Sequence, residues 1–196
     1  MVFITEHLKP RKLGPDDYRY IGIPSSSWAA RLDRVGELVR PIIKAYVDNR
    51  AGNMKTGQGL FLYGLPRCGK TCVAAGIAKV MFAYGYSVYF THASTIREAN
   101  RYSTKFDDEV SVLNRSANVD LLVIDDFTVE DTKNPFYGAE QFKQLLKLRT
   151  DWLRPSIVVT SVNLRDRTSR DTDAMEFIRK LPNMPVVSIT PYIEEA

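Results

Sequence analysis

Gly64-Leu65-Pro66-Arg67-Cys68-Gly69-Lys70-Thr71 fits the pattern G-x-x-x-x-G-K-[ST], and an apolar run, residues 60–63, leads directly into it. Glycines in such a loop let successive backbone N–H groups point at phosphate oxygens, and the helix expected at residues 70–83 directs its positive end at the same place. In this pattern Lys70 would bridge the β and γ phosphates of ATP and Thr71 would hold Mg²⁺. The alternative, a glycine-rich turn with a chance lysine, is disfavoured by the strand before and the helix after. The residues expected to contact the nucleotide are Gly64, Leu65, Pro66, Arg67, Cys68, Gly69, Lys70, Thr71 and Cys72.

Composition sets the limits for the rest of the chain. A length of 196 residues with 44% apolar content suits one α/β domain, and a net charge of +4 permits polyanion binding without requiring it. The two cysteines, Cys68 and Cys72, fit neither a disulfide framework nor a zinc pattern, and neither histidine indicates a metal site; His92 follows a predicted strand as a capping or packing residue. We expect a soluble, cytoplasmic protein without a membrane segment, a location that includes the cytoplasm of an infected host.

Hydrophobic periodicity predicts an α/β fold with a parallel sheet covered by helices on both faces. Residues 1–27, rich in proline, glycine and serine, are interpreted as an N-terminal arm, and residues 28–196 as the core. From Trp28 to about residue 49 the spacing predicts a helix that Pro41 kinks or divides, followed by a loop at 52–59. Near-continuous apolar runs predict strands at residues 60–63, 87–91, 119–126, 156–160 and 186–189, and helices are expected at 70–83, 94–117 (one or two), 138–152 and 173–181.

A second site motif is the apolar run 119–124 that ends in Asp125-Asp126, 54 residues beyond Thr71. This pattern is typical of a Walker B element. The two motifs together indicate a nucleotide site far more strongly than either does alone. Asp125 would accept hydrogen bonds from water on Mg²⁺, and Asp126 would orient the attacking water. The alternative is a turn or helix-capping pair. An Asp is shorter than the Glu common at the second position, which predicts slow hydrolysis.

The fourth predicted strand ends in Thr160-Ser161-Val162-Asn163, where a polar side chain could reach the γ-phosphate and the attacking water. Asn163 is the first choice for this sensor and Ser161 the second. The alternative is an ordinary strand-to-loop turn, which such residues favour.

The motifs together resemble one known family. Residues 59–64, the phosphate loop, residues 119–127 and residues 148–161 look like the AAA+ ATPase module of the DnaC/DnaI helicase loaders and of the similar IstB transposition helpers, over about residues 50–190. The family usually reads Thr-Ser-Asn without Val162. The resemblance implies a P-loop NTPase of the AAA+ type that binds ATP and Mg²⁺, self-assembles, and contacts single-stranded DNA and a replicative helicase. We expect a reduced or absent C-terminal lid and no separate helicase-docking domain.

The resemblance also implies an arginine supplied by a neighbouring subunit, which stabilises charge on the transferred phosphoryl group. Matching residues 177–181 to the family's Ser-Arg-Leu step makes Arg179 the candidate, with Arg170 in reserve. An exposed surface arginine is the alternative.

Basic residues lie on the segment between the second and third strands, which faces the central channel in AAA+ assemblies. They could follow a phosphate backbone while Tyr102 or Phe106 stacks on bases; a solvated helix face, partly balanced by acidic neighbours, is the competing interpretation. The candidates for DNA contact are Arg97, Arg101, Lys105 and Arg115.

The leading hypothesis is therefore a slow, assembly-dependent ATPase that acts in DNA replication as a helicase loader or a loader-like, possibly viral, factor. Three alternatives stay open: an IstB-like transposition helper, a nucleotide switch that does not hydrolyse, and a small P-loop kinase. The kinase is disfavoured because no Arg-rich lid or acceptor site is evident.

Overall fold

The computed structural model describes residues 9–102, 107–127, 135–161, 180, 181 and 183–189. A five-stranded sheet runs through its centre, and the strands stand in the order β2-β3-β4-β1-β5 with every pairing parallel. The strands are β1 (Leu60–Tyr63), β2 (Val88–His92), β3 (Leu121–Asp125), β4 (Ser156–Thr160) and β5 (Val186–Ser188). The predicted parallel sheet is confirmed.

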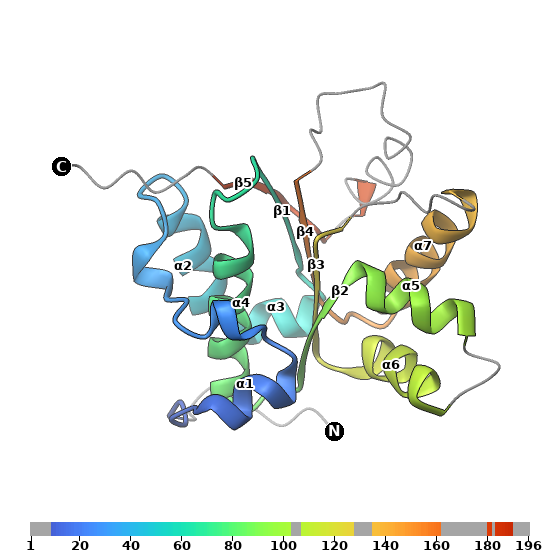
Figure 1. Ribbon diagram of the computed structural model, residues 1–196. Coiled ribbons are helices and arrows are strands. Elements are labelled where there is room, and N and C mark those ends of the chain that lie inside the picture. Colours follow the sequence, from blue (N-terminus) through green and yellow to red (C-terminus); the bar gives the residue numbers. More distant parts are fainter. Residues whose placement is uncertain (1–8, 103–106, 128–134, 162–179, 182, 190–196) are drawn as a thin grey trace.

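Helices cover both faces of this sheet, as Figure 1 shows. On one side lie α1 (Pro15–Ile21), α2 (Arg40–Asp48) and α4 (Lys70–Ala83), with α3 (Arg50–Thr56) leading into β1 and two short 3-10 turns, η1 (Ser25–Ser27) and η2 (Leu32–Arg34). On the other side lie α5 (Ala93–Tyr102), α6 (Asp107–Asn118) and α7 (Pro135–Asp151).

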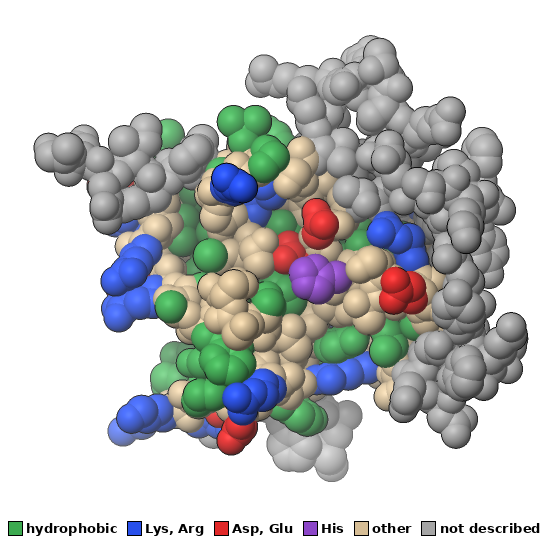
Figure 2. Space-filling model, in the orientation of Figure 1, with side chains coloured by type: hydrophobic (Ala, Val, Ile, Leu, Met, Phe, Trp, Pro, Cys, Tyr) green, Lys and Arg blue, Asp and Glu red, His purple; other side chains and the backbone are tan. Residues whose placement is uncertain are grey.

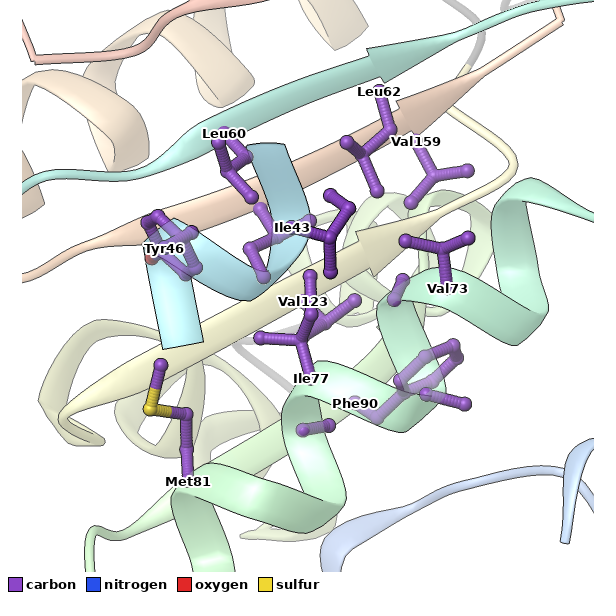
Figure 3. Close-up of a cluster of buried hydrophobic side chains, with 14 of the residues drawn as sticks. Ile43, Tyr46, Leu60, Leu62, Val73, Ile77, Met81, Phe90, Val123 and Val159 are labelled. Carbon is purple, nitrogen blue, oxygen red and sulfur yellow. The ribbon is translucent and has the colours of Figure 1, made fainter. Parts of the chain in front are cut away.

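Alternate residues of β1, β2, β3 and β4 enter two separate apolar clusters. Leu60 and Leu62 of β1 face α2 and α4, and Figure 3 shows them with Ile43 and Tyr46 of α2 and with Val73, Ile77 and Met81 of α4. Phe61, between them, joins the opposite cluster with Phe142 and Leu146 of α7. Both faces of each central strand are therefore buried, which explains why these strands are apolar at nearly every position.

The N-terminal segment belongs to the core. Helix α1 begins at Pro15 and ends at Ile21, followed by Gly22, whose φ of +87° suits glycine. Ile21 and Ile23 are buried in the α4-side cluster, and the Trp28 indole N–H donates to the Ile23 carbonyl at 2.9 Å. The arm expected at residues 1–27 is thus, from α1 onward, a packed layer of the fold.

The predicted helix from Trp28 is wrong in its first half. Residues 32–34 form η2, and the α-helix begins only at Arg40, with Pro41 in its first turn. Proline lacks an N–H and is tolerated there, because the first N–H groups of a helix have no internal partner. The expected loop at 52–59 is helical as far as Thr56, where Gly57 (φ +70°) ends α3. Of the helix expected at 173–181, residues 173–179 lie outside the described part.

One buried arginine ties the α6–β3 connection to the α7–β4 connection. Arg149 in α7 is fully buried and makes six hydrogen bonds of 2.7 to 3.2 Å. Burial lowers its pKa to about 9, so it remains a cation at neutral pH. Its acceptors are the Ser156 hydroxyl and the carbonyls of Ser116, Ala117, Val119, Asp120 and Pro155.

Candidate nucleotide-binding site

The predicted phosphate loop joins β1 to α4, and its two glycines are required for different reasons. Gly69 precedes α4 with φ +92°, a conformation that L side chains rarely adopt. At Gly64 an added Cβ would lie 2.3 Å from the Ile189 carbonyl oxygen and 2.9 Å from Cys68 Sγ. The chain after β5 therefore fixes the start of the loop, and only glycine fits there.

Lys70 lies inside the curl of this loop. Its side chain is 6% exposed, and Nζ donates to the carbonyls of Gly64 (2.9 Å) and Leu65 (2.7 Å). A cation enclosed by a loop at a helix N-terminus fits a triphosphate, whose oxygens would compete with these carbonyls for the ammonium group.

Thr71 and Asp125 meet at the start of α4. The Thr71 hydroxyl donates to Asp125 Oδ1 at 3.2 Å, although 54 residues separate them in sequence. Burial raises the pKa of Asp125, opposed by hydrogen bonds from the Asp126 backbone and the Thr71 hydroxyl and by the nearby His92. Hydroxyl and carboxylate oxygens are ligands that suit Mg²⁺. Across the described residues no three His, Cys, Asp or Glu side chains gather as a metal site.

The exposed rim of the site contains Asp126 and His92. Asp126 follows β3 with φ +51°, and its side chain is exposed. His92 ends β2 opposite Asp125 in the strand register, and Figure 2 shows acidic side chains beside a histidine on this face. The sequence interpretation gave His92 only a capping or packing role. The parallel register of β2 and β3 brings it to the acidic pair.

The end of β4 lies between the strands that carry the two motifs. Thr160 is fully buried, and its hydroxyl donates to the Phe127 carbonyl at 2.7 Å, which joins the end of β4 to the chain leaving β3. Ser161, the next residue, is exposed at that edge. The first-choice sensor Asn163 and both candidate trans arginines, Arg179 and Arg170, lie outside the described residues.

A cavity of about 300 Å³ adjoins the phosphate loop on the α4 side. Its wall is formed by the segment after α1 together with Cys72 and Ile189, so the structure places Cys72 beside the loop. Lys79 in α4 holds this wall, because Nζ donates to the carbonyls of Ser27, Trp28 and Ala30 at 2.6 to 3.1 Å. The cavity is lined by Ser26, Ala29, Ala30, Arg31, Arg34, Val35, Gly36, Cys68, Gly69, Cys72, Val73 and Ile189.

Several solved structures are similar to this fold. No protein-family model and no curated protein matches the sequence. The structure is similar to that of DnaI (TM-score 0.69, 17% identity, covering 87% of this chain and 96% of that one). It is also similar to the DnaC helicase loader (TM-score 0.66, 20% identity, 84% and 99%). A third similar structure is the replication initiator DnaA bound to AMPPCP and single-stranded DNA (TM-score 0.66, 18% identity, 86% and 51%).

This chain has the fold of an AAA+ P-loop core. It spans about half the length of the DnaA chain that it matches and nearly the whole of the DnaI and DnaC chains. At identities of 17 to 20% the likeness concerns the fold, so the roles of individual residues depend on the site geometry above.

The basic residues predicted to contact DNA fall on two helices, α5 and α6, as far as the structure describes them. Arg97 is half-buried in α5, which begins at the carboxyl end of β2, and Arg101 lies one turn further along the same helix. Arg115 lies in the last turn of α6, which leads to the amino end of β3. Lys105 is outside the described residues. Arg115 and the start of α5 therefore lie toward opposite ends of the parallel sheet.

None of the helices in the described part of this AAA+ fold combines the length and apolar character needed to cross a membrane.

Proposed function

We propose that this chain is an ATP-binding, slowly hydrolysing AAA+ ATPase that acts in the cytoplasm in DNA replication, as a helicase loader or a loader-like factor. The observation that carries the proposal is the 3.2 Å hydrogen bond between Thr71 and Asp125 at one edge of the sheet. It lies beside Lys70, whose Nζ donates to two carbonyls of the phosphate loop at 2.7 and 2.9 Å. The fold alone would not carry it, because one fold supports many functions.

Each residue has a defined task in this proposal. The Lys70 ammonium neutralises the β and γ phosphates, and the loop N–H groups orient them. Thr71 and Asp125 would hold Mg²⁺, directly or through water, and the ion would supply positive charge at the phosphate oxygens. Asp126 orients the attacking water with its exposed carboxylate. Asn163 or Ser161 senses the γ-phosphate, and Arg179 or Arg170 of a neighbouring subunit stabilises the developing charge.

The proposed partners are single-stranded DNA, a replicative helicase and further copies of the chain. ATP binding would order a multimer, because the trans arginine comes from a neighbour, and hydrolysis would release it. The similarity to DnaC and DnaI supports this assignment at the level of fold. A nucleotide switch that does not hydrolyse is the second candidate, favoured by the Asp at position 126, since a carboxylate one methylene shorter places water less well.

Light scattering of the full chain with ATP, ADP and single-stranded DNA tests the proposal. We expect larger assemblies with ATP than with ADP, and ATP hydrolysis that single-stranded DNA stimulates. Lys70→Ala should abolish both effects, whereas Lys55→Ala, at an exposed position of α3, should abolish neither. Unchanged assembly and turnover in Lys70→Ala, or phosphate transfer to a nucleoside, would refute the proposal.

Asp126→Asn separates the two candidates. An ATPase should lose turnover by about 10²-fold or more, as when one positioned polar group is removed, and still assemble with ATP. A background rate identical to that of wild type would identify the switch.

A further inference from the structure

A second cavity lies at the other end of the sheet from the phosphate loop. It has a volume of about 350 Å³ and opens where α4 ends, where β2 begins, and where α1 and the last turn of α6 pack against them (Figure 1). Helix α4 starts at the phosphate loop and has 14 residues, so its length alone separates the two sites by about 20 Å. We name this second cavity the distal pocket; the residues that matter here are Arg11, Tyr20, Phe82, Gly85, Tyr86 and Arg115.

Both cations of the distal pocket are guanidinium groups stacked on aromatic rings. The Arg11 guanidinium lies 4.4 Å from the Phe82 ring centroid, and that of Arg115 lies 4.3 Å from the Tyr89 centroid and 5.2 Å from the Tyr20 centroid. Stacking fixes the plane of a guanidinium while its edge N–H groups stay available for a planar anion. Arg115 uses part of that edge to donate to the Tyr20 carbonyl, and Arg11 pairs with Asp17 at 2.9 Å.

The positive charge and the exposed aromatic ring of the distal pocket together indicate which ligand it suits. Among the described residues no Asp or Glu lines the distal pocket, so Arg11 and Arg115 are the charged groups of its lining, and the Asp17 that pairs with Arg11 lies outside it. Tyr20 is 68% exposed, an unusual position for an aromatic side chain that also contacts Phe82 at a ring-centroid distance of 6.0 Å. A Cβ placed at Gly85 would meet no atom within 4 Å, so this part of the lining faces open space.

We infer that the distal pocket binds one nucleotide of a single-stranded nucleic acid, with its phosphates on Arg11 and Arg115 and its base against Tyr20. Stacking on an exposed ring suits a base of any sequence, and a base in a duplex would have both faces covered. An acidic peptide would satisfy the arginines but leave the ring surface unused. A volume of about 350 Å³ is at the small end of ligand pockets and suits a single nucleotide.

This inference rests on the proposed binding of single-stranded DNA and gives it a location. It also places Arg115 in a nucleic-acid site with Arg11 and Tyr20, separate from Arg97 and Arg101. Nucleic acid would then contact the fold at one end of α4 while ATP binds at the other, and α4 with its N-terminal covering layer would lie between the two ligands.

The test is the fluorescence anisotropy of labelled oligo(dT) with the full chain, measured over a series of salt concentrations. The double variant Arg11→Gln/Arg115→Gln should bind about 10- to 100-fold more weakly at low salt. Its slope of log K against log salt should be smaller by about 1.4, which is 0.7 for each of two lost phosphate contacts. Tyr20→Ala should bind about 5- to 150-fold more weakly with an unchanged slope, because it removes stacking and no charge.

The matched control is Arg19→Gln. Arg19 lies on α1, pairs with Asp16 and stacks over Trp28 at 5.1 Å, yet it does not line the distal pocket. It should bind oligo(dT) as wild type does. ATP binding and thermal unfolding are measured on every variant to check that it is folded. If the double variant does not fold, Tyr20→Ala, at an exposed position, still tests the inference.

The outcomes distinguish this inference from the proposed function. Wild type that fails to bind oligo(dT) would refute single-strand binding and the inference with it. Binding by wild type that Tyr20→Ala and the double variant leave unchanged would overturn only the location. Displacement of oligo(dT) by poly-glutamate at equal charge concentration would also overturn it, and would identify the distal pocket as a peptide site.

Discussion

Replacing Arg149 by methionine should destabilise the fold strongly although the residue is far from the nucleotide. Arg149→Met keeps an unbranched side chain of similar length and removes the donors of six hydrogen bonds. Five of the acceptors are backbone carbonyls, in the last turn of α6 and in the α6–β3 and α7–β4 connections, and they remain when the arginine is replaced.

The size of the effect follows from opposing contributions. Burial disfavours the charged guanidinium, as its lowered pKa shows, so removing the charge recovers part of the loss. Each buried carbonyl left without a donor costs roughly 1–3 kcal/mol, reduced where water enters the space. We expect a net loss of about 3–5 kcal/mol, a large share of the ~5–15 kcal/mol that stabilises a typical domain.

Urea unfolding followed by circular dichroism measures this loss. Arg149→Lys keeps the charge but offers three donors, so it should lose less than Arg149→Met. Arg154→Ala is the control, because Arg154 also donates to the Ala117 carbonyl but at a partly exposed position, and it should cost under ~1 kcal/mol. If Arg149→Met unfolds within ~1 kcal/mol of wild type, the hydrogen bonds are not what holds these connections together.

Three further predictions concern the nucleotide site. Gly64→Ala should abolish ATP binding, measured by calorimetry, because its methyl group would overlap the Ile189 carbonyl; retained affinity would show that the chain after β5 gives way. Lys79→Met should weaken the binding of ATP about 10-fold while tripolyphosphate binds as before, because the substitution releases the wall of the adjoining cavity and leaves the phosphate loop intact. Lys79→Arg should restore most of the affinity for ATP. An equal loss of affinity for both ligands would argue against the role of Lys79 in holding this wall. Burial raises the pKa of Asp125, so the folded state binds more protons than the unfolded state from about pH 4 upward, and stability is lost as pH rises through that window. Asp125→Asn should therefore raise the Tm at pH 7 by ~2–4 °C, and this gain should vanish below about pH 4. Mg²⁺-dependent ATP binding should fall in the same variant. A lower Tm at pH 7 would mean that the hydrogen bond from Thr71 stabilises the charged Asp125 more than burial destabilises it.

The sheet and the phosphate loop could be predicted because their signals are local. A strand buried on both faces needs apolar residues throughout, and the loop needs Gly64, Gly69 and Lys70 at fixed spacing. Helix α4 was predicted to the residue, Lys70–Ala83. The stretch after Trp28 misled the prediction because apolar residues at helical spacing also occur where 3-10 turns cover a cavity, as residues 28–39 do here.

The rim of the site depended on information that local patterns do not carry. His92 meets Asp125 only because β2 pairs with β3, and the sequence does not state the strand order. The wall of the cavity beside the loop depends on Lys79 reaching carbonyls about 50 residues away. Asp125, by contrast, was recognisable because its motif ends a buried strand.

The packing of the N-terminal layer changes how this protein can be shortened. A chain begun at Trp28 would retain every residue of both nucleotide motifs, yet it would lose Ile21 and Ile23 from the cluster that covers α4. It would also lose the Ser27 carbonyl that Lys79 holds. Such a truncated protein would expose an apolar strip along the helix that follows the phosphate loop, and we expect it to be recovered as aggregate rather than as a smaller ATPase.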